Sequence, residues 1–239
     1  IISFCTLFFI LGLIDDLKIN IPPKFRLIVM ISFLLILVIF NGLYVEKISL
    51  EYLDNLMKLD IFALFFVCLC FLFIINGSNL IDGFNGLLGI HTLIIFVVLF
   101  FINFFKDSNI QYVLFYSSLI ISIFIVFNFP KARIFLGDSG AYLIGTLIAI
   151  LTIKTNNLDQ SISSFFYCIL LFYLFFEVFF SFFRKILIVK NSPLFPDDKH
   201  LHMLFYKYLL RKNNNKLNSN YKASIYINLI YLCLITPGI

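Results

Sequence analysis

The sequence predicts an all-α fold, a polytopic helical bundle embedded in a membrane. Of its 239 residues, 62% are hydrophobic and 13% are charged, about half the roughly 25% charged share of a soluble domain. A water-soluble chain of this composition would expose large apolar patches, which soluble proteins avoid. The apolar runs are long and unbroken, whereas transmembrane β-barrels need alternating segments of about ten residues.

Runs without a charged residue give the expected spans, because about 20 helical residues cross a hydrocarbon layer about 30 Å thick. Four such runs have 19, 21, 23 and 23 residues, namely 27–45, 61–81, 83–105 and 108–130. Further expected spans are a short one at 139–153, a long one at 160–183 that contains Glu177, and two interpreted as clipped by the chain ends, 1–14 and 223–239. We therefore expect about eight spans in a single transmembrane domain, 1–239, truncated at both ends.

The basic residues predict the orientation of these spans. If the first span ends in the cytoplasm, the cytoplasmic segments are 15–26, 76–87, 130–140 and 184–222. They contain all but four of the 18 Lys and Arg residues, which is a clear positive-inside signal. The net charge of +5 therefore reflects topology, and without a groove-reading or aromatic-plus-basic motif we expect no nucleic-acid partner.

Acidic residues occur in every one of the four cytoplasmic segments. They are Asp15, Asp16, Asp82, Asp138, Asp197 and Asp198. Segments that alternate with spans must converge on one membrane face, so these carboxylates are expected to meet there. Because Mg²⁺ takes one or two carboxylates together with phosphate oxygens and water, the pattern predicts a divalent cation and a phosphorylated ligand.

The first two segments carry polar residues in distinct patterns. Asp15 and Asp16 directly follow an apolar span, where their repulsion calls for a cation or a proton, although a solvated span terminus would also explain them. In the second segment, polar residues recur every three positions, at Asn76, Asn79, Asp82 and Asn85, beside Gly83, Gly86 and Gly89. On a helix this spacing makes a polar ladder beside a glycine strip. Close helix packing explains the glycines but not the amides, so we expect ligand contact.

In the third segment, Pro130 ends one span and Ser139 or Asp138 is expected to cap the next helix. The free N–H groups of that helix start, together with Lys131 and Arg133, would make an anion site. Asp138 is placed to hold the metal that the anion shares. Both basic residues serve equally well as topology determinants.

The fourth segment, 184–222, is expected to be a cytoplasmic loop with an interfacial amphipathic helix. Apolar residues recur there at helical spacing, at Leu201, Leu204, Phe205, Tyr208 and Leu209. His200 and His202 lie in its first turn, where two positions apart they are expected to point in different directions and to contact phosphate at the helix start. Glu177, an acid inside a span, is either functional or a contact that orients its helix.

These motifs resemble those of the polyprenyl-phosphate N-acetylhexosamine-1-phosphate transferases, the superfamily of glycosyltransferase 4 and the phospho-N-acetylmuramoyl-pentapeptide translocase. They are Asp15-Asp16, the Asn76/Asn79/Asp82-Gly83 pattern, Gly137-Asp138-Ser139-Gly140 and His200-Leu201-His202. The resemblance extends from Gly12 to about Tyr208. A His-Leu-His element, instead of three consecutive histidines, is closer to the transferases that initiate surface-polysaccharide synthesis.

The resemblance implies a phospho-glycosyltransferase of about ten or eleven spans in the bacterial inner membrane, with its site on the cytoplasmic face. It would use Mg²⁺, with Mn²⁺ as an alternative, to transfer a sugar 1-phosphate from a UDP-N-acetylhexosamine to undecaprenyl phosphate, releasing UMP. The product would start a lipopolysaccharide, capsule or other cell-wall polymer. The partners are then the two substrates and the lipid bilayer, with a homodimer as an option.

The resemblance also implies roles for individual residues. Asp15 would engage or deprotonate the lipid phosphate with help from Asp16, and Asp138, with Asp16, would ligate the metal. Asn79 and Asp82 would contact the nucleotide region, and His200 and His202 the diphosphate. Two positions depart from the family, since Asn85 replaces a common acid and Met203 a further histidine.

Two other functions fit a membrane helical bundle. A secondary transporter would place its site near the bilayer midplane between repeats, yet only Glu177 is deep and no repeat is visible. A catalytically inactive scaffold of the same fold would have lost one of the acids Asp15, Asp16, Asp82 and Asp138, and all are present.

Overall fold

The computed structural model describes residues 1–19, 21–106, 108–190 and 198–238, and within these ranges it contains helices and no strand. The α-helices are α1 (Ile2–Asp16), α2 (Pro23–Asn41), α3 (Glu51–Met57), α4 (Asp60–Ile81), α5 (Leu87–Ile102), α6 (Ser108–Asn128), α7 (Gly137–Leu158), α8 (Ser164–Leu170), α9 (Phe172–Phe183), α10 (Leu201–Asn213) and α11 (Lys216–Ile235). A π-helix, η1 (Arg184–Val189), continues α9, and a 3₁₀ turn, η2 (Thr236–Gly238), follows α11. The prediction of an all-α membrane bundle is confirmed.

Among the described helices, fewer than the expected eight are long and apolar enough to span a membrane alone. Four qualify, α2, α4, α6 and α7, and a fifth does if α8 and the α9–η1 helix, bent by 69° at their junction, count as one broken span. The helices α1 and α5 have only 15 and 16 residues, and α11 begins with a polar stretch. The other expected spans, 1–14, 83–105 and 223–239, correspond to α1, α5 and α11.

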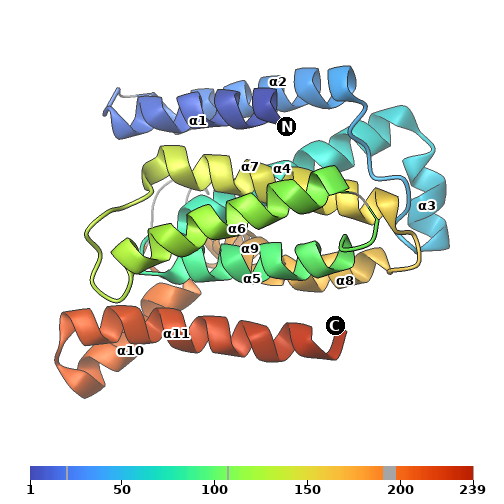
Figure 1. Cartoon of the computed structure of the whole chain (residues 1–239). Coiled ribbons are helices and arrows are strands. Elements are labelled where there is room, and N and C mark those ends of the chain that lie inside the picture. The colour runs from blue at the N-terminus through green and yellow to red at the C-terminus, as the bar shows by residue number, and fades with distance from the viewer. Residues whose placement is uncertain (20, 107, 191–197, 239) are drawn as a thin grey trace.

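The helix α7 forms the centre of the bundle. It packs against α1, α4 and α5, and its side chains are buried along most of its length. Figure 1 shows α1 and α2 on one side of this central group and α10 with α11 on the other. The amphipathic helix expected in the fourth segment is thus present as α10, which packs on α11.

Glycines let the central helices touch. A β-carbon on Gly12 of α1 would lie 2.5 Å from the backbone of Asp138 and Ser139, and one on Gly145 of α7 would lie 2.7 Å from the α-carbon of Ile75 in α4. Real β-carbons do not approach other atoms so closely, so both contacts require glycine. They bring the end of α1 and the length of α4 directly onto α7.

The polar pattern of the second segment is not one continuous helical ladder, and that expectation is wrong. Helix α4 ends at Ile81 and α5 starts at Leu87, so Asn76 and Asn79 are helical whereas Asp82 and Asn85 lie in the turn. Gly86 adopts a left-handed conformation with φ +77°, which favours glycine. The spacing of three therefore crosses a helix end.

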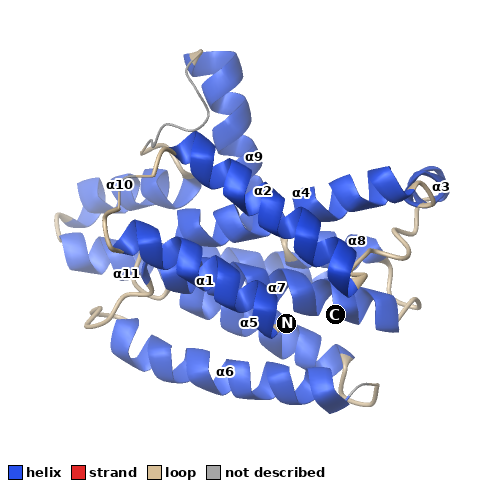
Figure 2. Cartoon of the chain, turned by 90° about the horizontal axis from the view of Figure 1, so that it is seen from above, coloured by secondary structure: helices blue, strands red, loops and turns tan. Residues whose placement is uncertain are grey.

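The segments expected on the cytoplasmic side meet at one end of the bundle. The α1–α2, α6–α7 and α10–α11 connections all lie on the left in Figure 1, and the α4–α5 turn is hydrogen-bonded to Asn220 of α11 and to Pro130 of the α6–α7 connection. Figure 2 shows the far end of α9 and η1 projecting from the bundle. We call the end where these connections gather the loop end.

Candidate active site

The first feature of the loop end is a contact between α1 and the start of α7. The Asp16 carboxylate accepts hydrogen bonds from the backbone N–H groups of Asp138 at 2.9 Å and Ser139 at 3.0 Å. Gly137 has φ +68°, and a β-carbon there would lie 2.8 Å from the Asp16 oxygens. The α7 start has no cap from its own N-cap residue, Leu136. The expected cap by Ser139 or Asp138 is therefore wrong, because α7 already begins at Gly137 and Asp16 supplies the acceptor.

The side chain of Asp138 lies among groups from three other helices, α1, α2 and α4. The carboxylates of Asp15 and Asp16 and the guanidinium of Arg26 are near enough to act on it electrostatically, and the Asn79 side chain is within hydrogen-bonding reach. The structure thus brings together acids from the first and third segments and an amide from the second. This confirms the expected convergence for these residues, and we call Asp15, Asp16, Asp82 and Asp138 the carboxylate cluster.

Asp82 belongs to this cluster because the carboxylates of Asp138 and Asp16 act on it electrostatically. Burial, followed by the nearby carboxylates of Asp138 and Asp16, raises the pKa of Asp82 from 3.8 to about 7. A carboxyl with such a pKa is partly protonated near neutral pH. A cation placed among these acids would favour the ionised form.

Arg26, at the start of α2, belongs to the site. The sequence indicated it only as one of the basic residues that set the topology. Its guanidinium pairs with the Asp15 carboxylate at 2.5 Å and acts electrostatically on Asp138. The signal in the sequence was its place between Pro22-Pro23 and an apolar helix, eleven residues after Asp15. That spacing fits a tight connection that folds the start of α2 back onto the end of α1.

Two other candidates, Asn85 and Asn76, donate side-chain hydrogen bonds to backbone carbonyls of the protein. The Asn85 side chain donates to the carbonyl of Pro130 at 2.9 Å while its backbone N–H donates to Asn220 at 3.0 Å. Asn76 donates to the carbonyl of Leu72 in its own helix. Lys131 and Arg133 are exposed on the α6–α7 connection, where they are open to an anionic ligand from solvent.

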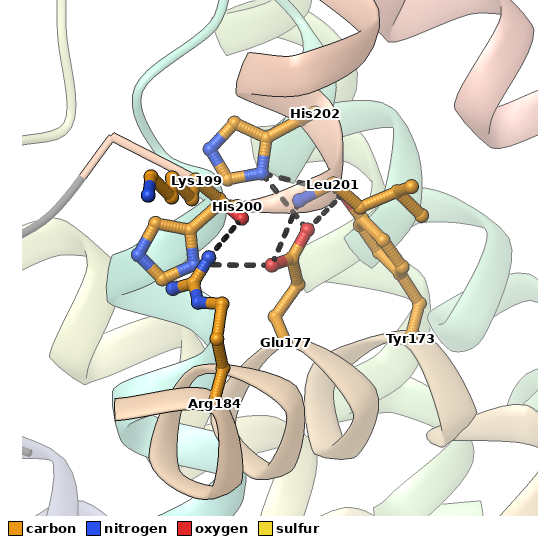
Figure 3. Close-up of polar contacts among 7 residues, drawn as sticks. All are labelled: Tyr173, Glu177, Arg184, Lys199, His200, Leu201 and His202. Atoms are coloured by element: carbon orange, nitrogen blue, oxygen red, sulfur yellow. Dashed lines mark hydrogen bonds and ion pairs between the residues drawn. The ribbon is translucent and has the colours of Figure 1, made fainter. Parts of the chain in front are cut away.

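The two histidines meet Glu177, which is fully buried in α9. Its Oε2 lies 3.1 Å from His200 Nδ1 and its Oε1 lies 3.0 Å from His202 Nδ1, as Figure 3 shows. The two rings are parallel within 7°. The expectation that they point in different directions is wrong, because His200 is the extended N-cap residue of α10, with ψ 154°, and helical spacing does not apply to it.

Phe84 connects this histidine pair with the carboxylate cluster. Its ring lies edge-on to His202, with centroids 5.1 Å apart, and edge-on to Tyr206, with centroids 5.3 Å apart. Phe84 is two residues from Asp82 in the same turn. Of the remaining acids of the fourth segment, Asp198 pairs with Lys207, and Asp197 lies outside the described residues.

The donor set at the carboxylate cluster fits Mg²⁺. The ion prefers oxygen ligands and fills its octahedron with phosphate oxygens and water around one or two carboxylates, so it needs no closed cage. Within the described ranges, no group of three or more His, Cys, Asp or Glu side chains forms such a cage. Asp138 is the best-placed ligand, because both Asp16 oxygens already accept backbone N–H groups.

The fold and this site define a multi-pass membrane protein with a carboxylate and histidine site at the ends of its helices. Residues 1–156 match the sequence model of glycosyl transferase family 4. The chain belongs to this family. The matched range includes α1, the α4–α5 turn and the start of α7, the elements that carry the carboxylate cluster.

Individual relatives agree with the family. Over 199 residues, 82% of this chain, it is 31% identical to the undecaprenyl-phosphate alpha-N-acetylglucosaminyl 1-phosphate transferase of Thermotoga maritima, of which it covers 58%. Over 163 residues, 64% of this chain, it is 32% identical to the phospho-N-acetylmuramoyl-pentapeptide-transferase of Dictyoglomus thermophilum, of which it covers 51%. The chain thus spans between half and three fifths of the length of these relatives.

Proposed function

We propose that this protein transfers an N-acetylhexosamine 1-phosphate from a UDP-sugar to undecaprenyl phosphate and releases UMP. The site would lie at the cytoplasmic face of a bacterial inner membrane, and the product would start a cell-envelope polysaccharide. The names of the relatives support a lipid phosphate as acceptor. The observation that carries the proposal is the carboxylate cluster around Asp138 at the loop end of the bundle.

The reaction needs positioning and charge neutralisation more than covalent chemistry from the protein. An oxygen of the lipid phosphate would attack the sugar-side phosphorus of the UDP-sugar. The bond between that phosphorus and the bridging oxygen would break, leaving UMP and a lipid diphosphate sugar. Asp15, paired with Arg26, would take up any proton still held by the lipid phosphate, and Arg26 would attract that phosphate.

The remaining residues would orient the donor. Asp138, with Asp16 behind it, would hold Mg²⁺, which neutralises charge on the diphosphate oxygens. Asn79 and Asp82 would contact the nucleotide, and Lys131 and Arg133 would attract the anionic donor from water. His200 and His202 would contact phosphate oxygens.

The transporter alternative is less well supported. A transporter site would lie near the bilayer midplane, whereas the carboxylate cluster lies at helix ends. Glu177, the acid that the sequence placed inside a span, is engaged by two histidines and Tyr173. Its oxygens are therefore already occupied by protein groups.

An activity assay tests the proposal. The purified protein in detergent, with Mg²⁺ and undecaprenyl phosphate, receives UDP-N-acetylglucosamine or UDP-N-acetylgalactosamine, and UMP is measured. We expect UMP only when both substrates are present, and a loss on the order of 10²-fold or more in Asp138→Asn, as for the removal of a group that stabilises transition-state charge. Asp198→Asn, an acid at the same end paired with Lys207, is the control. Unchanged UMP release in Asp138→Asn would contradict the role of this site.

A binding measurement tests the metal without activity. Mg²⁺ that binds only the folded protein raises its thermal stability by RT ln(1 + [Mg²⁺]/Kd). We expect this increase in the unmodified protein and in Asp198→Asn, and its loss in Asp138→Asn. An increase of equal size in all three proteins would place the ion elsewhere.

A further inference from the structure

Glu177 is surrounded by hydrogen-bond donors on both of its carboxylate oxygens. Besides the two histidine nitrogens, Oε1 accepts the Tyr173 hydroxyl at 3.0 Å and Oε2 lies 3.4 Å from the backbone N–H of Leu201. An ionised carboxylate only accepts hydrogen bonds. An ionised Glu177 therefore holds both rings by hydrogen bonds only when the Nδ1 atoms that face it carry protons.

With Nδ1 of His202 held by Glu177, Nε2 is the ring nitrogen of His202 left for a ligand. With Nδ1 protonated, Nε2 is an acceptor in the neutral ring and a second donor in the charged ring. The rings of His200 and His202 are parallel, with centroids 5.6 Å apart. Figure 3 shows the second nitrogen of both rings pointing to the same side, away from Glu177.

One of these nitrogens has an unfulfilled hydrogen bond. Nε2 of His202 is buried and has no hydrogen-bond partner among the described residues, and the whole residue is 0% exposed. A buried polar atom without a partner costs about 1–3 kcal/mol. A substrate oxygen bonded to this nitrogen would remove this cost.

We propose that Glu177 is a positioning residue that holds His200 and His202 by their Nδ1 atoms, so that Nε2 of His202 faces a phosphate oxygen of a substrate. The proposal rests on the proposed function for the identity of that substrate. Phosphate oxygens accept hydrogen bonds, so Nε2 of His202 carries a proton when the ligand is bound. Glu177 offsets the resulting positive charge on this ring.

Nuclear magnetic resonance of ¹⁵N-labelled histidine tests this in the unmodified protein. The chain has three histidines, and the third, His91, lies in α5, so the spectrum is simple and can be assigned with His200→Asn and His202→Asn. We expect protonated Nδ1 in both His200 and His202. A deprotonated Nδ1 in either ring would overturn the proposal.

Adding each substrate alone identifies the phosphate source. UDP-N-acetylglucosamine and undecaprenyl phosphate are titrated separately, with Mg²⁺ present, while the Nε2 signals are followed. A change of the His202 Nε2 signal toward the protonated form with either substrate supports the proposal and shows which phosphate the pair contacts. No change with both substrates would overturn it.

A double-mutant cycle separates positioning from a purely structural tether between α9 and α10. We expect Glu177→Gln to lower kcat/KM about 10²-fold, as for a small misplacement of a contacting group, and His202→Asn to have a similar effect. Because Glu177 acts through the histidine, the double variant should lose about 10²-fold, whereas independent effects would multiply to about 10⁴-fold. Multiplied losses would overturn the proposal.

The control is Ser181→Ala, which changes a buried polar residue of the same helix and should keep the activity of the unmodified protein. Thermal unfolding shows whether Glu177→Gln is folded. If it is not, the histidine ¹⁵N spectrum of the unmodified protein still tests the proposal. A protein that releases no UMP but shows both protonated Nδ1 atoms and the Nε2 change would refute the proposed reaction and leave the positioning intact.

Discussion

Asp16 caps the helix that carries Asp138. Its two carboxylate oxygens lie 2.9 and 3.0 Å from the backbone nitrogens of Asp138 and Ser139, more than 120 positions later in the chain. Asp16, at the end of α1, therefore fixes the position of the first turn of α7. This contact also keeps Asp15 beside Asp138, since Asp15 and Asp16 are adjacent.

Removing this cap should weaken both the fold and the site. We expect Asp16→Ala to lower the free energy of unfolding by about 1 kcal/mol, the usual value of an N-terminal helix cap, because two N–H groups lose their acceptor. Thermal or denaturant unfolding in detergent measures the change. Asp198→Ala, which removes an exposed acid at the same end, should change stability by less, because exposed ion pairs contribute little. Equal effects of the two variants would refute the cap.

Gly12 should tolerate no side chain. A β-carbon would lie 2.5 Å from the backbone of Asp138 and Ser139, so Gly12→Ala must push α1 away from α7. We expect a loss of about 1–3 kcal/mol in unfolding free energy, as for other overpacked cores. Gly83→Ala is the matched control, since its β-carbon would meet nothing within 4 Å and the change should stay within about 0.5 kcal/mol. A Gly12→Ala protein as stable as Gly83→Ala would contradict the close contact.

Asp82 should make stability depend on pH. Its pKa is raised from 3.8 to about 7 by burial and by Asp138 and Asp16, so between these two values the folded state holds more of this proton than the unfolded state. Its contribution to stability therefore falls as pH rises from about 4 to about 7. Asp82→Asn removes this dependence, so the variant should gain stability over the unmodified protein at pH 8 relative to pH 4.

Thermal unfolding of both proteins at the two pH values, without divalent ions, checks this prediction. Each unit of pKa difference corresponds to about 1.4 kcal/mol. Mg²⁺ bound beside Asp82 would favour its ionised form and reduce the difference. A stability difference between the two proteins that does not change with pH would show that Asp82 titrates normally.

Asn85 should hold the α4–α5 turn against the α6–α7 connection. Its amide donates to the carbonyl of Pro130 at 2.9 Å, and Asn85→Asp replaces this donor with a carboxylate that faces a carbonyl oxygen. We expect a loss of about 1 kcal/mol in unfolding free energy. Asn55→Asp is the matched control, because Asn55 acts as an acceptor for Lys58 and an aspartate keeps that role. An equally stable Asn85→Asp would favour the ligand contact that the sequence indicated.

The sequence alone determined the class of fold and which loops gather at the same end of the bundle. Charge-free runs and the bias of Lys and Arg decide these, because burying charge in a bilayer and translocating basic loops are unfavourable whatever the detailed packing. The same reasoning placed Asp15, Asp16, Asp82 and Asp138 at one end. Periodicity alone also predicted α10, whose residues follow helical spacing.

Only the tertiary structure decided which atoms meet. Asp16 became the cap of α7 because Gly12 and Gly137 let two backbones approach, and no local pattern encodes an acceptor more than 120 residues away. His200 turned to lie parallel to His202 because it is an extended N-cap residue that Glu177 binds from another helix. Contacts between distant elements depend on how the helices pack, and spacing along one helix cannot reveal them.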